Sequence, residues 1–97
     1  MGFDIYGKKP TKGTGKYYRA SIRIWPYLWG QIGTHCKDIL TTEQINAGFT
    51  NSGVFIRREQ ALKLAERMDG LLKSGELSYF GDDFIDFAKN SRGFTID

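Results

Sequence analysis

Apolar residues recur at helical spacing through much of the chain. The longest such stripe predicts a helix from about Arg57 to Ser74, which Gly75 ends because glycine readily adopts the left-handed conformation of a helix stop. The apolar members of this stripe are Ala61, Leu62, Ala65, Met68, Leu71 and Leu72. A second stripe predicts a helix over residues 26–37, with Pro26 in its first turn. Its members are Trp25, Leu28, Trp29, Ile32, Cys36 and Ile39.

Capping residues indicate two shorter helices. Thr41, followed three residues later by Gln44, resembles a capping box and predicts a short helix that ends at Gly48. A last helix is expected to start at Asp82 or Asp83, since carboxylates are favoured at the positive end of a helix. Its residues expected to face the core are Phe84, Ile85 and Ala88.

Alternating positions predict a strand from Tyr17 to Ile24. One face of it would contain Tyr18, Ala20, Ile22 and Ile24, and the other Tyr17, Arg19, Ser21 and Arg23. Shorter strands are expected from Phe3 to Tyr6 and from Phe94 to Ile96, whereas residues 49–54 have the composition of a loop. These elements predict a helix-rich α+β fold, in which three to four helices pack against a small antiparallel sheet.

The composition fits one folded domain. The chain has 97 residues, of which 40% are hydrophobic and 14% aromatic, so it can bury one core and is too short for two. We therefore treat residues 1–97 as a single domain. The lone cysteine, Cys36, forms no internal disulfide, and no secretory signal or run of about 18 apolar residues is visible. These features predict a cytoplasmic protein with no membrane partner.

Positive charge gathers in the first quarter of the chain. The formal net charge is +3, but residues 1–24 contain six lysines and arginines against one acidic residue, Asp4. Residues 7–16 are rich in glycine, lack an apolar anchor and are expected to form a mobile basic loop. Its lysines are Lys8, Lys9, Lys12 and Lys16. A local positive field attracts phosphates or acidic protein surfaces, although a solvated loop without a partner is the alternative.

Aromatic residues are dense directly after this loop. Rings can stack on bases while arginines pair with phosphates, and both residue types also anchor protein interfaces. The candidates for exposed binding residues are Tyr17, Arg19, Arg23 and Tyr27. Trp25 and Trp29 lie four residues apart on one helical face, which is more typical of a core.

Catalytic and metal-binding motifs are weak. The run Gly13-Thr14-Gly15-Lys16 lacks the first glycine and the final Ser or Thr of a phosphate-binding loop, although free amides there could still hold a phosphate. His35 and Cys36 are adjacent, so on a helix their side chains point about 100° apart. That arrangement suits neither a zinc site nor a nucleophile–base pair. We expect no metal and no cofactor, and an undetected small enzyme remains only as an alternative.

Both ends of the chain and one internal segment resemble a single family. They are the start Gly2-Phe3-Asp4-Ile5 with Gly7 and Pro10, the segment Tyr17-Tyr18-Arg19 with Trp25 and Leu28-Trp29, and the ending Asn90-Ser91-Arg92-Gly93-Phe94-Thr95-Ile96. They resemble a family of small uncharacterised proteins from bacteria and their phages. This chain has Pro26-Tyr27 where that family has Arg-Pro, and Arg92 where a glycine is usual. The resemblance implies a bacterial or phage origin and no particular activity.

Together these features favour a non-catalytic binding module. The basic loop and the strand with aromatic and arginine residues would engage a phosphate-bearing ligand, either a nucleotide or a nucleic acid. The alternative is a phage-encoded antagonist or adaptor that docks on a host protein.

Overall fold

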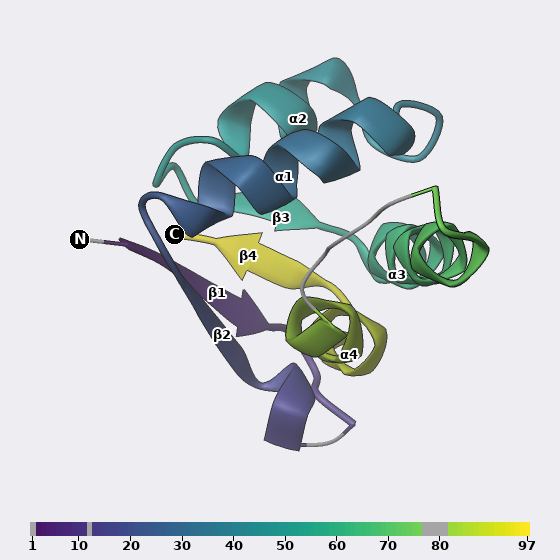
Figure 1. Ribbon diagram of the computed structural model, residues 1–97. Helices are drawn as coiled ribbons and strands as arrows, with labels where there is room; N and C mark the ends of the chain where they lie inside the picture. Colours follow the sequence, from purple (N-terminus) through teal and green to yellow (C-terminus); the bar gives the residue numbers. More distant parts are fainter. Residues whose placement is uncertain (1, 12, 77–81) are drawn as a thin grey trace.

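A four-stranded antiparallel sheet forms one layer of the protein. The computed structural model describes residues 2–11, 13–76 and 82–97. The strands are β1 (Gly2–Gly7), β2 (Tyr17–Ser21), β3 (Val54–Ile56) and β4 (Phe94–Ile96). Their order is β2-β1-β4-β3, so β4 lies between β1 and β3 (Figure 1).

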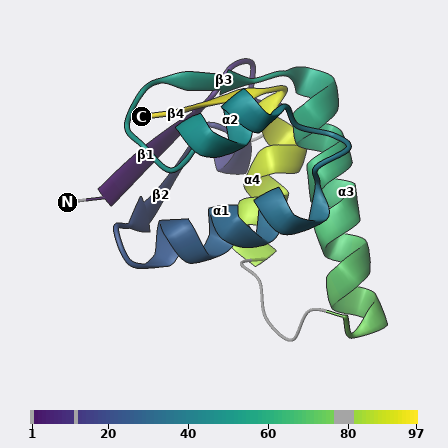
Figure 2. The ribbon, with the colours of Figure 1, turned by 90° about the horizontal axis from the view of Figure 1, so that it is seen from above.

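The helices form the other layer, on one face of the sheet. Within the described residues they are α1 (Ile24–His35), α2 (Thr42–Ala47), α3 (Arg58–Ser74) and α4 (Asp82–Ser91), with a short 3-10 helix at Gly13–Gly15. Figure 2 shows α4 between the sheet and α3, while α1 runs across the end of this layer. The expected α+β class is therefore confirmed.

Alternation along the strands creates the core. The inward side chains of the sheet include Phe3, Ile5, Ala20, Ile56, Phe94 and Ile96, none of which is more than 5% exposed. They meet a cluster of buried rings from the helices. Trp25 stacks on Trp29 with centroids 5.5 Å apart, and it also meets Phe84 at 5.5 Å and Phe3 at 5.9 Å. Each such large side chain contributes about 1.5–3 kcal/mol by leaving water.

The tryptophan indoles also fasten α1 to α2. Trp25 Nε1 donates to the Gly48 carbonyl at 2.8 Å, and Trp29 Nε1 donates to the Ile45 carbonyl at 2.8 Å. Both rings are completely buried, so the expected core role is confirmed. The capping box at the start of α2 is confirmed as well, because Thr41 and Gln44 exchange hydrogen bonds at 3.0 and 3.1 Å.

The strand predicted from Tyr17 to Ile24 is too long. β2 ends at Ser21, and Ile22 and Ile24 are 58% and 49% exposed instead of facing the core. The Ser21 hydroxyl accepts a hydrogen bond from Ile24 N at 3.1 Å, so the chain turns into α1 before Pro26. Arg23 consequently lies at the start of a helix, and the prediction that it shares a strand face with Tyr17 is wrong.

Two further predictions need correction. The loop expected over residues 49–54 ends one residue too late, because Val54 begins β3, which at three residues is too short for alternation to reveal. In α3, Leu62 is 46% exposed and Leu64 is buried in its place. The predicted end of α3 is confirmed, since Gly75 adopts a left-handed φ of 83°.

The basic segment from residue 7 to residue 16 is fastened to the end of α4 by its backbone. Lys9 N donates to Ser91 O at 3.0 Å, and Thr11 N donates to Asn90 O at 2.8 Å. Gly15 packs so closely that a Cβ there would lie 2.2 Å from Asn90 O. This close packing explains why residue 15 has no side chain. The mobility of the segment stays a prediction.

No helix in the described part of the chain is both long and apolar enough to cross a membrane.

Candidate functional site

The face of the sheet opposite the helices is open. Residues that alternate with the core positions lie on it, and several are large and exposed. In β1 and β2 these are Tyr6, Tyr17 and Arg19, with the half-buried Asp4 beside them, and in β3 the exposed residue is Phe55. Two of the expected binding residues, Tyr17 and Arg19, are therefore exposed on one face, as the alternation predicted.

Strand register aligns the rings of this face in a single row. Tyr17 pairs with Tyr6, Tyr6 with Thr95, and Thr95 with Phe55, so the row crosses all four strands. The rings of Tyr6 and Tyr17 are in contact, with centroids 5.2 Å apart. Their exposed fractions are 46% and 44%, and that of Phe55 is 40%. We call Tyr17, Tyr6 and Phe55 the aromatic row.

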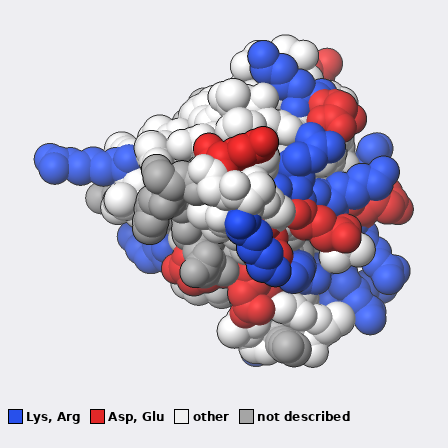
Figure 3. All heavy atoms as spheres, turned by 45° about the vertical axis from the view of Figure 1, so that its right-hand side comes forward, with Lys and Arg blue, Asp and Glu red and all other residues white. Residues whose placement is uncertain are grey.

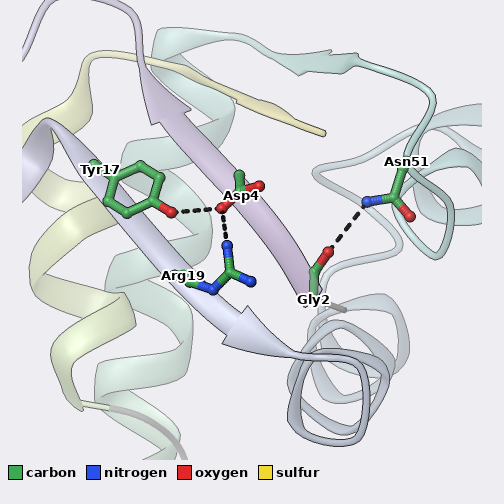
Figure 4. Close-up of polar contacts among 5 residues, drawn as sticks. All are labelled: Gly2, Asp4, Tyr17, Arg19 and Asn51. Carbon is green, nitrogen blue, oxygen red and sulfur yellow. Dashed lines mark hydrogen bonds and ion pairs between the residues drawn. The ribbon is translucent and has the colours of Figure 1, made fainter.

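A polar cluster lies beside the row on β1 and β2 (Figure 4). Tyr17 Oη donates to Asp4 Oδ1 at 2.5 Å, and Arg19 Nη1 donates to the same oxygen at 2.7 Å. The hydrogen bond from Tyr17, helped by the positive charge of Arg19, lowers the pKa of Asp4 below its usual value. The same hydrogen bond raises the pKa of Tyr17. At neutral pH this face therefore has an ionised Asp4 that holds both neighbours in place.

Arg19 remains available to a ligand despite this ion pair. Its side chain is 57% exposed, and only one of its five N–H groups bonds to Asp4. The row and Arg19 together offer flat apolar rings beside a planar cation. That combination suits a ligand with both planar and anionic parts.

Basic residues from separate segments gather at one end of the sheet. At this end β1 and β3 finish while β2 and β4 begin, because neighbouring strands are antiparallel. The exposed residues that flank these strand ends are Lys8, Lys9, Lys16, Arg57, Arg58 and Arg92. We call this group the basic end. It adjoins the aromatic row directly, since Lys8 Nζ lies 5.5 Å from the centroid of the Phe55 ring.

The predicted lysines thus fall into two groups. Lys8, Lys9 and Lys16 belong to the basic end, whereas Lys12 lies outside the described residues. Some of the amides in this segment are already engaged. Lys8 N donates to Gly93 O at 2.8 Å, and Lys16 N donates to Gly13 O at 3.2 Å. That the remaining amides of the run Gly13-Thr14-Gly15-Lys16 hold a phosphate stays a prediction.

Arg23 and Tyr27 are not part of this face. Both belong to the start of α1, which packs with the helical layer on the other side of the sheet (Figure 1). Tyr6, Phe55 and Arg92 take their place, although they are not among the binding residues that the sequence predicts. The alternation of the first strand could have revealed Tyr6. Phe55 and Arg92 gave no such signal, because they are brought to the site by the pairing of β3 with β4.

The residues examined for nucleophilic and metal chemistry do not form such a centre. Burial raises the pKa of the Cys36 thiol to about 11, so this thiol is a packed core group and a poor nucleophile. Among the described residues, no group of three or more His, Cys, Asp or Glu side chains could hold a metal ion.

A hollow of about 600 Å³ lies between α3 and the segment after α1. Its charged walls are balanced, with three cations and three carboxylates. The cations are Arg57, Lys63 and Arg67, and the carboxylates are Asp38, Glu59 and Glu66. Arg67 is already engaged, because its two Nη atoms donate to both carboxylate oxygens of Asp38 at 2.8 and 2.9 Å. The hollow therefore has less unpaired charge than the basic end.

No family model matches the chain, and neither a curated protein nor a solved structure is significantly similar to it. The resemblance to a bacterial and phage family stays a prediction, and the function has to be argued from the residues of the open face.

Proposed function

We propose that the protein is a non-catalytic module that binds a phosphate-bearing ligand of the nucleic-acid class. The observation that supports this most is the aromatic row on an open sheet face, directly beside the basic end. Bases would stack on Tyr17, Tyr6 and Phe55, and phosphates would pair with lysines of the basic end and with Arg19.

The length of the row favours a single-stranded segment over one nucleotide. Strands in a sheet lie about 4.8 Å apart, so the row from β2 to β3 extends over roughly 14 Å. A single base covers only a part of that length, whereas two or three successive bases fill it. Duplex DNA would not fit this mode, because its bases are already stacked on one another.

Fluorescence anisotropy of a labelled ten-nucleotide single strand at low salt tests the proposal. Replacing one ring, in Tyr6→Ala or Phe55→Ala, should weaken binding by roughly 5- to 100-fold, since stacking contributes about 1–3 kcal/mol per base. Phe49→Ala is the matched control, because Phe49 is also 40% exposed but lies outside the row. Equal affinity in all three variants, or no binding of any oligonucleotide, would exclude this function.

A protein partner is the second candidate, and the carboxylates of the open face favour it. Asp4 belongs to β1, one of the two middle strands, and exchanges backbone hydrogen bonds with Asp97 at 2.9 and 3.0 Å. Two acidic residues therefore lie side by side there, and their negative charges repel phosphates. The row would then act as an interface anchor. This candidate would be favoured by a partner that binds the wild-type protein but not Phe55→Ala. Added oligonucleotide should leave the binding of that partner unchanged. The predicted cytoplasmic location is compatible with both.

A further inference from the structure

A small hollow of about 200 Å³ lies where α3 begins beside the end of α4. Its lining residues are Thr11, Arg58, Leu62, Ala88, Lys89 and Arg92. The wall that comes from the basic segment is fixed, because the Thr11 hydroxyl donates to Asn90 Oδ1 at 3.0 Å and Thr11 N donates to Asn90 O at 2.8 Å. The hollow is therefore bounded by two helices and an anchored turn.

Three cations line this hollow and no carboxylate does. The ion pairs found among the described residues involve other cations, and the side chains of Arg58, Lys89 and Arg92 form no hydrogen bond within that part of the chain. Lys89 also borders a second hollow that contains Asp69 and Asp86, which balances part of its charge. Figure 3, in which the α3 and α4 side of the molecule comes forward, shows many basic side chains over the right-hand part of this surface, with acidic side chains between them.

The two arginines among these cations occupy positions that are locally unfavourable. Arg58 is the first residue of α3, so its cation lies at the positive end of a 17-residue helix. Arg92 has a φ of 56°, and within the described residues it is the one non-glycine residue with a left-handed backbone. Neither residue has a partner in the described protein that offsets this cost. A bound anion would offset the unfavourable position of the Arg58 cation at the start of α3.

We infer that this hollow binds a phosphate group. The guanidinium forks of Arg58 and Arg92 match the geometry of phosphate oxygens, and the Lys89 ammonium adds a third positive charge. Leu62 and Ala88 give the hollow an apolar wall, which suits an organic phosphate ester as well as the free ion. The hollow contains no member of the aromatic row. Arg58 and Arg92 also belong to the basic end, but the hollow needs no stacked base, so the inference goes beyond the proposed function.

Titration of the ¹⁵N-labelled protein with inorganic phosphate tests the inference by NMR. We expect saturable shifts at residues 58, 62, 89 and 92 in low salt. Arg58→Gln and Lys89→Gln should each weaken phosphate binding by about 5-fold or more, because each removes a charge-assisted contact. Lys37→Gln is the control, since Lys37 is exposed and does not line the hollow. Equal weakening by the control, or shifts without saturation, would overturn the site.

Arg92→Gly separates ligand binding from a structural role of this residue. Glycine accepts the φ of 56° without strain, so the variant should keep the wild-type melting temperature while it loses phosphate affinity. Unchanged phosphate affinity in Arg92→Gly and Arg58→Gln would contradict the inference. Phe55→Ala should bind phosphate normally, which distinguishes this site from the aromatic row.

The source of the phosphate is settled by comparing two oligonucleotides. One has a 5′-phosphate and the other a 5′-hydroxyl, with the same sequence. If Arg58→Gln lowers the affinity for the phosphorylated strand alone, the hollow takes a terminal phosphate. If Arg58→Gln weakens the binding of inorganic phosphate while both strands bind as before, the hollow binds a free phosphate or a small ester. If the variant changes the affinity for neither inorganic phosphate nor the strands, the inference fails.

Discussion

Gly93 has little freedom to change, because it joins the end of α4 to β4 at a φ of 100°. A Cβ at this position would lie 2.9 Å from Ile56 O and 3.2 Å from Arg58 N. Only a residue without a side chain fits both the backbone angle and the adjoining strand. Gly93 thereby holds β3 next to β4 and places Arg92 beside Arg58.

Gly93→Ala should lower the free energy of unfolding by about 2 kcal/mol or more, through backbone strain and the clash with β3. Gly70→Ala is the matched control. Gly70 lies inside α3 with nothing within 4 Å of a built Cβ, so alanine there should stabilise the protein by about 0.5–1 kcal/mol. Urea unfolding of both variants measures the difference. Equal effects would show that the left-handed backbone at Gly93 is not required.

Asp38 should give the stability a dependence on acid pH. Its paired hydrogen bonds from Arg67 lower the pKa of this carboxyl from 3.8 to about 2. A carboxyl whose pKa is depressed by folding stabilises the protein above its unfolded pKa and loses that contribution as the pH falls through the folded value. The loss therefore falls between about pH 4 and pH 2. Urea midpoints over this range should drop less in Asp38→Asn than in the wild-type protein.

Glu76→Gln provides the comparison for that experiment, because Glu76 is an exposed carboxylate with no ion pair among the described residues. Its acid profile should follow the wild-type profile. If Asp38→Asn has that same profile, the Arg67 ion pair adds nothing to stability in acid, as happens for many pairs on a protein surface.

At the scale of elements, α1 and α2 behave as one unit because two indoles join them. Trp29→Phe removes the hydrogen bond to the Ile45 carbonyl and part of a fully buried ring, so it should cost about 2–3 kcal/mol. Phe55→Leu, on the open face, should cost under about 0.5 kcal/mol. Chemical denaturation distinguishes the two. A small effect at Trp29 would mean that the α1–α2 unit tolerates rearrangement.

Elements with local signals could be predicted from the sequence, and elements set by tertiary contacts could not. Thr41 with Gln44 and the left-handed Gly75 are local devices, and both occur where expected. The end of β2 depends on a hydrogen bond that the Ser21 hydroxyl accepts from Ile24 N, which alternation does not reveal. β3 exists because β4 pairs with it, and three residues of its own sequence are too few to show a period.

The candidate site follows the same division. Tyr17 and Arg19 share the strand on which alternation placed them, and both are exposed. Phe55 and Arg92 reach the site only through the order β2-β1-β4-β3, which joins segments about forty residues apart in sequence. Arg23 is not part of the open face for a local reason, because the chain leaves β2 before this residue and Arg23 is the N-cap residue at the start of α1.

At the scale of the whole molecule, charge distribution determines how ligand binding responds to salt. The net charge is only +3, so a uniform positive field is weak and the basic end must provide most of the attraction. For single strands, the logarithm of the affinity falls with the logarithm of salt concentration by about 0.7 per neutralised phosphate. Lys8→Gln should therefore reduce this slope by about 0.7, measured by anisotropy between low and physiological salt. Lys37→Gln should leave the slope unchanged, and a change there instead would place the phosphates elsewhere.

The strand that completes the sheet is also the last of the four along the chain. β4 separates β1 from β3, so until residues 94–96 leave the ribosome the β1–β2 hairpin and the β3 segment have no backbone ladder between them. Until then, Ile5 of the hairpin and Ile56 of β3 lack their shared neighbours, Phe94 and Ile96. The open face consequently becomes one continuous surface in a single step, when one short strand enters the gap.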